Sequence, residues 1–144
     1  MNLTVQNIGV VQPVTNAEIL KWLNLVLSKS KHATLTIRFV GSKESRLLNR
    51  QYRDKDYPTN VLTFAYATAP LQADLVLCTP VLRREAKEQG KHLRDHLAHL
   101  IIHGALHSLG YDHETKGDAK IMEAIEIKAL KRLAIGDPYA DSPA

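Results

Sequence analysis

Three histidines stand close together in this sequence and could bind one metal ion. His103 and His107 are four residues apart, so on a helix their imidazoles lie on one face, one turn apart. Glycine tolerates the left-handed conformation that ends many helices, so Gly110 lets the chain turn and bring back His113 as a third ligand. Catalytic zinc sites have three protein ligands and one position for water or substrate, whereas structural sites have four protein ligands. The histidines therefore predict a catalytic metal site, and a structural ion is the alternative.

The spacing of these residues matches the metzincin protease signature, in which two helical histidines precede a glycine and a third histidine. In those proteases a glutamate directly after the first histidine acts as general base, but here this position is Gly104. The peptidase hypothesis therefore lacks its catalytic base. Hydrolysis of another ester stays open, because a bound metal lowers the pKa of water from about 15.7 to about 7 without that carboxylate.

A charged loop carries a second candidate residue, Arg53. Residues 52–60 mix basic and acidic side chains, and Pro58 favours an extended backbone before it. This composition indicates a loop between a helix and a strand, where functional side chains are often displayed. A guanidinium offers paired donors that match phosphate oxygens and keeps its charge at ordinary pH. Arg53 could thus bind a phosphate, although a solvated surface loop explains the same composition.

The composition is typical of one small globular domain. The chain has 144 residues, of which 44% are hydrophobic and 24% charged, which is enough apolar material for a single core. We expect one domain over residues 1–136 and a flexible tail over residues 137–144. The formal net charge of +4 permits a polyanionic partner such as RNA but does not require one.

Two further features bear on where the protein works. The lone Cys78 cannot form an internal disulfide, and its apolar neighbours predict a buried thiol, so a reducing cytoplasm is favoured. The first residues lack the basic and apolar regions of a signal peptide. The most apolar segment, residues 97–109, is short and holds three histidines, so we expect a core helix there and no membrane span.

Strands and helices alternate along the chain. Apolar and β-branched runs predict strands at residues 3–11, 34–40, 61–66 and 74–78, with a linker containing Pro70 between the last two. Capping signals and helical spacing predict helices after Thr15, over 42–52, over 80–90, through the histidines, and over 115–133. The last helix is expected to bury Ile121, Ile125, Ala129 and Leu133. We predict a single α+β domain with a mixed four-stranded sheet, about five helices, and a metzincin-like metal-binding helix and turn.

Five segments together resemble the YbeY family of bacterial endoribonucleases. They are residues 52–64, 84–86, 99–113, 122–123 and 138–139, so the resemblance spans roughly residues 40 to 139. The histidine segment is the most specific of them, because that family has the metzincin-like spacing with glycine in place of the glutamate.

This resemblance implies a zinc-dependent, single-strand-specific endoribonuclease with one Zn²⁺ per chain. Its role would be ribosomal RNA maturation, notably of the 3′ end of 16S rRNA, and ribosome quality control. The implied partners are single-stranded RNA, ribosomal RNA and ribosomal particles in the cytoplasm. By the same resemblance, His103, His107 and His113 are the metal ligands and Arg53 is the functional arginine.

Two other functions stay open from the residues alone. The chain could be a metal-dependent hydrolase of another substrate, or a non-catalytic ribosome-assembly factor with a structural zinc. The ion itself is open as well, because imidazoles also accept nickel, copper or iron. Near the triad, His99 and Asp112 could each orient a ligand, although a core histidine and a turn-stabilising aspartate explain them equally.

Overall fold

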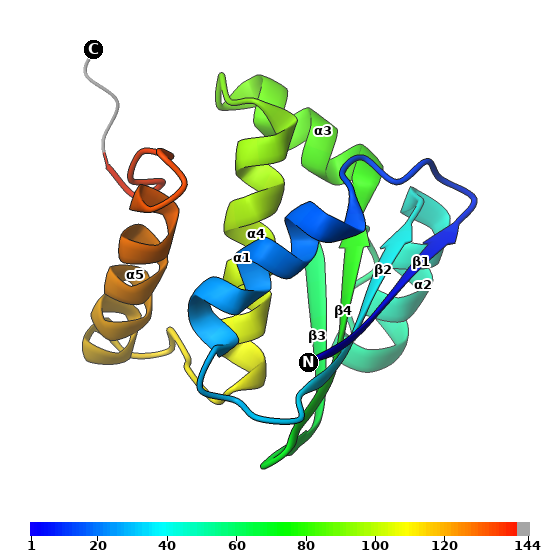
Figure 1. The fold of residues 1–144 in the computed structure, drawn as a ribbon. Helices are drawn as coiled ribbons and strands as arrows, with labels where there is room; N and C mark the ends of the chain where they lie inside the picture. The colour runs from blue at the N-terminus through cyan, green and yellow to red at the C-terminus, as the bar shows by residue number, and fades with distance from the viewer. Residues whose placement is uncertain (141–144) are drawn as a thin grey trace.

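A four-stranded sheet with helices on both faces forms the fold (Figure 1). The computed structural model describes residues 1–140. Its elements in chain order are β1 (Asn2–Ile8), α1 (Asn16–Leu27), β2 (Thr34–Val40), α2 (Ser42–Arg53), β3 (Val61–Thr68), β4 (Leu71–Cys78), α3 (Thr79–Glu88), α4 (Leu93–Ser108) and α5 (Lys116–Lys131). The predicted α+β class, with five helices and one mixed four-stranded sheet, is confirmed for the described residues.

The strand order is β1-β2-β4-β3. β1, β2 and β4 are parallel, and β3 pairs antiparallel with β4 at the edge of the sheet. Alternate residues of the two central strands are fully buried on one face, among them Leu35, Ile37, Leu75 and Leu77. Figure 1 shows α1 and α4 on that side of the sheet with α5 outside α4, while α2 lies on the opposite side.

Helix α4 is the central helix of the core. It contacts the sheet, α1, α3 and α5, and Leu97, Ile101 and Ala105 are completely buried. A Cβ atom at Gly104 would lie 2.9 Å from Leu75 Cδ2 of β4, so any larger residue would force the Leu75 side chain to shift at this close approach of helix and sheet. Because so much of α4 is enclosed, only a narrow part of its surface is left partly open, and His103 and His107 lie there.

Several local signals act as the sequence predicts. The Thr15 hydroxyl oxygen accepts a hydrogen bond from the Glu18 backbone N–H at 3.2 Å and so caps α1. Thr115 caps α5 in the same way, through the Asp118 N–H at 3.0 Å. Pro80 lies in the first turn of α3, where its missing N–H costs nothing. These caps fix the helix starts near their predicted places.

Strand ends differ from the prediction at two places. β1 stops at Ile8, before the predicted end at residue 11, because Gly9 has φ +68° and breaks the extended backbone. The predicted linker around Pro70 is wrong: β3 runs to Thr68 and β4 begins at Leu71, so the two strands form a hairpin. The alanines in this segment give no clear alternation of apolar and polar residues, so the sequence did not indicate strands here. Pairing across the hairpin extends both strands.

The predicted buried face of α5 is also wrong in part. Its buried residues are Met122, Glu126, Ala129 and Leu130, whereas Ile121 is 57% exposed. Packing against α4 sets the buried face, and Glu126 within it interrupts the apolar pattern that sequence periodicity relies on. Glu126 also contacts two histidines of α4, His99 and His103.

Two other predictions concern the chain end and the cysteine. Residues 137–140, the first part of the predicted tail, form a turn in which Asp137 Oδ1 accepts from the Tyr139 N–H at 2.8 Å; residues 141–144 lie outside the described residues. Cys78 is fully buried, as predicted. Within the described part of the chain, no helix has the length and apolar character needed to cross a membrane.

Candidate metal centre

The three predicted histidines converge at one point beside α4. His103, His107 and His113 each offer a ring nitrogen, and the three nitrogens lie within 4.8 Å of one another. The centroids of the His107 ring and of either neighbouring ring are 4.9 Å apart. His103 and His107 are half-buried, and His113 is exposed. The cluster could therefore hold one ion that solvent and a substrate can still reach.

A tight turn brings the third histidine back. After α4 ends, Gly110 takes φ +103°, a conformation that favours glycine. The Tyr111 N–H donates to the Leu106 carbonyl at 3.2 Å and closes the turn. Asp112 Oδ1 accepts from the backbone N–H of His113 at 2.7 Å. Of the two predicted roles for Asp112, the structure thus gives it the turn-stabilising one.

The histidine rings are suited to act as neutral ligands. Burial lowers the pKa of His107, and the neighbouring His103 and His113 lower it further, because a second positive charge there would be repelled. A neutral imidazole keeps the lone pair that a metal requires. Three imidazoles without a thiolate match the donor set of catalytic zinc, although other transition metals accept it too.

Glu126 of α5 lies directly behind this cluster and is fully buried. Its Oε1 accepts hydrogen bonds from His103 Nδ1 at 3.1 Å, from His99 Nε2 at 2.7 Å and from the Tyr139 hydroxyl at 2.8 Å. Because Nδ1 of His103 is used in this way, its Nε2 is left for the ion. A carboxylate behind a ligating imidazole is the usual support of a metal site, so the residues present fit a bound metal.

The charge of Glu126 is maintained by these donors. Burial alone would raise the pKa of the carboxyl, but the hydrogen bonds from His103 and His99 outweigh burial and bring the pKa to about 2. Burial and the adjacent Glu126 charge raise the pKa of the Tyr139 hydroxyl, so it stays protonated and donates. His99 thus reaches the triad through Glu126, in agreement with the orienting role that its spacing allowed.

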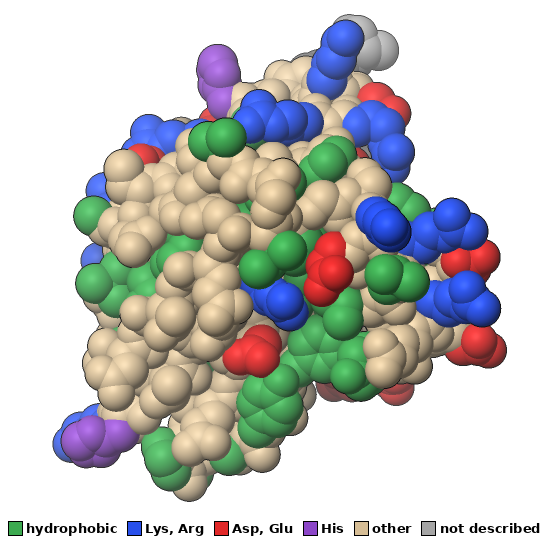
Figure 2. All heavy atoms as spheres, turned by 90° about the vertical axis from the view of Figure 1, so that its right-hand side faces the viewer, with side chains coloured by type: hydrophobic (Ala, Val, Ile, Leu, Met, Phe, Trp, Pro, Cys, Tyr) green, Lys and Arg blue, Asp and Glu red, His purple; other side chains and the backbone are tan. Residues whose placement is uncertain are grey.

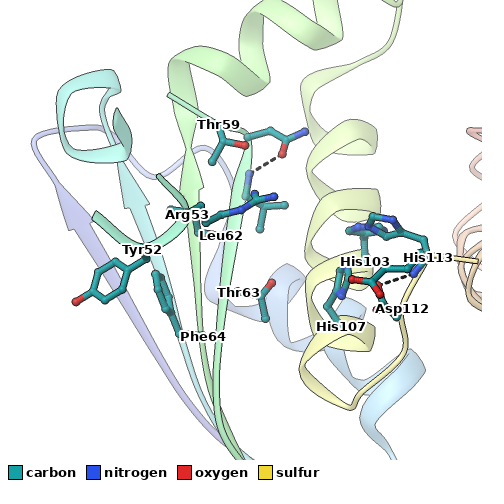
Figure 3. Close-up of a pocket in the computed structure, with 13 residues that line it drawn as sticks. Tyr52, Arg53, Thr59, Leu62, Thr63, Phe64, His103, His107, Asp112 and His113 are labelled. Atoms are coloured by element: carbon teal, nitrogen blue, oxygen red, sulfur yellow. Dashed lines mark hydrogen bonds between the residues drawn. The ribbon is translucent and has the colours of Figure 1, made fainter. Parts of the chain in front are cut away.

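Arg53 and the three histidines line one cavity of about 610 Å³. Its walls also include Thr59, Asn60 and Thr63, and Figure 3 shows Arg53 on the sheet side of the cavity, across from the histidines of α4. Arg53 is exposed and forms no ion pair among the described residues. Its guanidinium is therefore free to meet a phosphate within the cavity.

Two buried polar residues of α2 hold the loop that follows Arg53. The Ser45 hydroxyl donates to the Thr59 carbonyl and accepts from the Thr59 N–H, both at 3.0 Å. Asn49, which is fully buried, donates through Nδ2 to the Tyr57 carbonyl at 2.8 Å. The loop is thus tied to the helix that carries Arg53, so the arginine and Thr59 of the same cavity wall keep a fixed relation.

A polar network joins this wall to α4. Asn60 Nδ2 donates to both carboxylate oxygens of Glu85, at 3.2 and 3.3 Å, and Glu85 Oε1 lies 2.9 Å from Nε2 of the buried His96. These contacts connect the start of β3, α3 and α4. They explain why the segment 84–86, remote in sequence from the histidines, belongs with the site.

Sequence reasoning missed Glu126 and the wall residues Thr59, Asn60 and Thr63. Glu126 looked like an ordinary helix residue, because its partners are distant in sequence. A signal existed, since a glutamate stands four residues after Met122 and three before Ala129, inside the buried stripe. A charged residue in such a stripe needs partners, and histidines are the nearest candidates.

Comparisons with known proteins show which proteins this chain is similar to. A family model described as "Endoribonuclease YbeY" matches residues 5–134, so the likeness reaches further toward the N-terminus than the motifs alone indicate. A protein of that name from Verminephrobacter eiseniae is 52% identical over 126 residues, 87% of this chain and 80% of the relative. Another from Burkholderia lata is 56% identical over 125 residues, 84% of this chain and 72% of the relative.

One solved structure is similar in fold. The solution structure of a protein from Thermotoga maritima matches with a TM-score of 0.60 and 22% sequence identity, over 96% of this chain and 99% of that chain. At this identity the likeness concerns the fold alone, and it supports the α+β arrangement described above.

Proposed function

Because this chain belongs to the YbeY family of endoribonucleases, we propose that it is a zinc-dependent, single-strand-specific endoribonuclease that processes ribosomal RNA. Its implied tasks are maturation of the 3′ end of 16S rRNA and ribosome quality control, on ribosomal particles in the cytoplasm. The observation that carries the proposal is the meeting of three imidazoles and one arginine in a single open cavity. A buried, unpaired Cys78 suits the reducing compartment.

In this proposal His103, His107 and His113 hold the ion and Arg53 holds the substrate. Zinc, when bound, supplies a Lewis acid that makes water nucleophilic near neutral pH and polarises a phosphoryl oxygen. The Arg53 guanidinium donates to the non-bridging oxygens of the scissile phosphate and opposes the charge that grows there during cleavage. Glu126 keeps the proton on Nδ1 of His103, so that ring presents Nε2 throughout.

Peptide hydrolysis is a weaker candidate for the same residues. The position that carries the base in metzincins is Gly104, and it faces Leu75 and Thr63 of the sheet. A larger side chain at this position would meet Leu75 and Thr63 at its first carbon. The cavity instead offers a guanidinium, which matches a phosphate better than a peptide carbonyl.

Elemental analysis and RNA cleavage, measured together, test the proposal. We would compare wild type, His107→Ala and the control His92→Ala, which removes an exposed histidine outside the site. Wild type and the control should bind about one equivalent of zinc and cleave labelled single-stranded RNA, with activity lost to a chelator and restored by zinc. His107→Ala should lose both.

Two outcomes would contradict the proposed endoribonuclease function. Cleavage that persists in metal-free His107→Ala would mean that the nuclease activity comes from elsewhere. If wild type and the control bind zinc but cleave no RNA, and every variant still binds ribosomal particles, the assembly-factor function would be favoured. As a specificity control, duplex RNA of the same sequence should be cleaved much more slowly than the single strand.

A further inference from the structure

A second hollow of about 210 Å³ adjoins the cavity and has no role in the mechanism above. It lies on the α2 side of the sheet, lined by Arg38, Leu48, Tyr52, Phe64, Tyr66, Asp74 and Val76. Tyr52 and Phe64 line the catalytic cavity as well, so the two hollows share a wall at the edge strand β3. Figure 3 shows these two rings on one side of β3 and the histidines on the other, with Arg53 between.

The floor of this hollow is formed by the sheet, and Leu48 and Tyr52 of α2 line one side of it. Where α2 and α3 do cover this face, the sheet is apolar: Val40, Leu62, Val76 and Cys78 form a small buried core with Val81 of α3. Further along the strands the same face carries Thr36, Asp74 and Phe64 side by side in register. Figure 2 looks onto the side with β1, β2 and α2, and shows hydrophobic side chains bordering charged ones there.

Exposed aromatic rings form the rim of the hollow. Tyr52 is 60% and Tyr66 65% exposed. Phe64 supports Tyr52 edge-on, with ring centroids 5.1 Å apart and planes at 75°. The Tyr66 hydroxyl donates to Asp74 Oδ2 at 2.8 Å, which restrains the second ring. Proteins that bind single strands use such rings on a sheet to stack unpaired bases.

The charges of the hollow fit a base better than a phosphate. Asp74 would repel a phosphate, but its carboxylate can accept from the amino group of a base. Arg38 contributes donors, because its partly exposed guanidinium lines the hollow and is engaged among the described residues only by a long 3.6 Å ion pair between Nη2 and Glu44. Phosphate binding is thus left to Arg53, on the other side of the shared wall.

We propose that this hollow is a nucleobase subsite, in which a base next to the scissile phosphate stacks on Tyr66 and Tyr52 while its edge meets Asp74 and Arg38. The inference rests on the proposed endoribonuclease function and adds a substrate contact to it. A base can lie flat on these rings only when it is unpaired. The subsite therefore gives a physical reason for a single-strand preference, because a duplex presents its bases stacked and edge-on.

Binding of a labelled oligoadenylate of about ten nucleotides tests the subsite. Fluorescence anisotropy would be measured in chelator, so that the strand stays intact, for wild type, Tyr66→Ala, Tyr66→Phe, Tyr66→Leu and Tyr57→Ala. Tyr57 is a matched control, 53% exposed but outside both hollows. Tyr66→Ala and Tyr66→Leu should bind about tenfold more weakly, whereas Tyr66→Phe and Tyr57→Ala should bind like wild type. Thermal melting of each variant confirms that it is folded.

Cleavage of the same strand with zinc present separates this inference from the function on which it rests. If wild type cleaves RNA but Tyr66→Ala binds as tightly as wild type, the subsite is wrong and the endoribonuclease function stands. If Tyr66→Leu binds as well as Tyr66→Phe, the ring does not stack and the subsite is also wrong. If zinc-loaded wild type cleaves no RNA, the proposed endoribonuclease function is wrong, and the subsite inference that rests on it is wrong as well.

Discussion

Glu126 determines which nitrogen of His103 is free for the proposed ion, because the fully buried carboxylate accepts a hydrogen bond from Nδ1. Glu126→Gln keeps the shape of the side chain but removes the charge that holds the proton on His103 Nδ1. We expect about 10- to 100-fold weaker zinc binding, the usual effect of losing such a support. Competition with a chromophoric chelator measures this affinity without relying on activity.

Glu88→Gln is the control for that change, because Glu88 is an exposed carboxylate on α3 and lines none of the hollows that contain the histidines. Its zinc affinity should equal that of wild type. An unchanged affinity in Glu126→Gln, with a normal melting curve, would show that the carboxylate is not needed to orient the ligand.

Arg53 is the residue whose geometry, as well as its charge, we expect to matter. Arg53→Lys keeps a positive charge but loses the paired donors, so we expect kcat/KM for RNA cleavage to fall by at least about tenfold while zinc content stays at wild-type level. Arg50→Lys, one turn earlier on α2 and outside the cavity, is the control. Equal rates for wild type and Arg53→Lys would make Arg53 a surface residue.

Of the residues in the site, the sequence could predict the three histidines but not Glu126. His103, His107 and His113 lie within one helix and turn, so spacing alone brought them together. Glu126 is 23 residues after His103, and the pair meets only because α5 packs on α4. Contacts of that kind depend on tertiary packing, which local periodicity does not contain.

At the scale of elements, the approach of α4 to the sheet depends on Gly104. An added Cβ would lie 2.9 Å from Leu75 Cδ2 and 3.4 Å from Thr63 Oγ1. Helix propensity favours alanine, but the overlap opposes it, and we expect Gly104→Ala to lower the free energy of unfolding by about 1–3 kcal/mol. Urea denaturation of the zinc-free protein measures the change.

A double-mutant cycle with Leu75→Ala identifies the cause of that loss. If the Leu75 side chain is the obstacle, Gly104→Ala should lower the free energy of unfolding much less in the Leu75→Ala background than in wild type. Equal costs in both backgrounds would mean that the added methyl group meets something else.

The elements themselves were predictable where their signals are local. Thr15, Thr115 and Pro80 mark helix starts correctly, since capping depends on neighbours in sequence. The β3–β4 hairpin was not predictable from the alanine-rich segment around Pro70, because its strands are extended by pairing with each other. The strand order likewise depends on contacts between distant parts of the chain, which the local sequence pattern does not contain.

At the scale of the whole molecule, the larger of two buried cores in the described residues joins most of the elements. A single cluster of buried apolar residues includes side chains from α1, α4, α5 and the sheet, so the described chain should unfold as one cooperative unit. The buried and partly buried members of this core end at Ile135. This supports the prediction of one domain over residues 1–136, which stays a prediction.

Removal of residues 137–144 tests that boundary and the role of Tyr139 together. The shortened chain keeps the entire described core, so it should fold and unfold in one transition. It loses the Tyr139 hydroxyl, which donates to the buried Glu126 at 2.8 Å, and a hydrogen bond to a charged group contributes about 1.5–3 kcal/mol. Tyr139→Phe in the full chain removes only that hydroxyl, so urea denaturation should give both variants a similar loss. A shortened chain that cannot fold would move the domain boundary beyond residue 136, whereas wild-type stability in both variants would leave Glu126 held by its histidines alone.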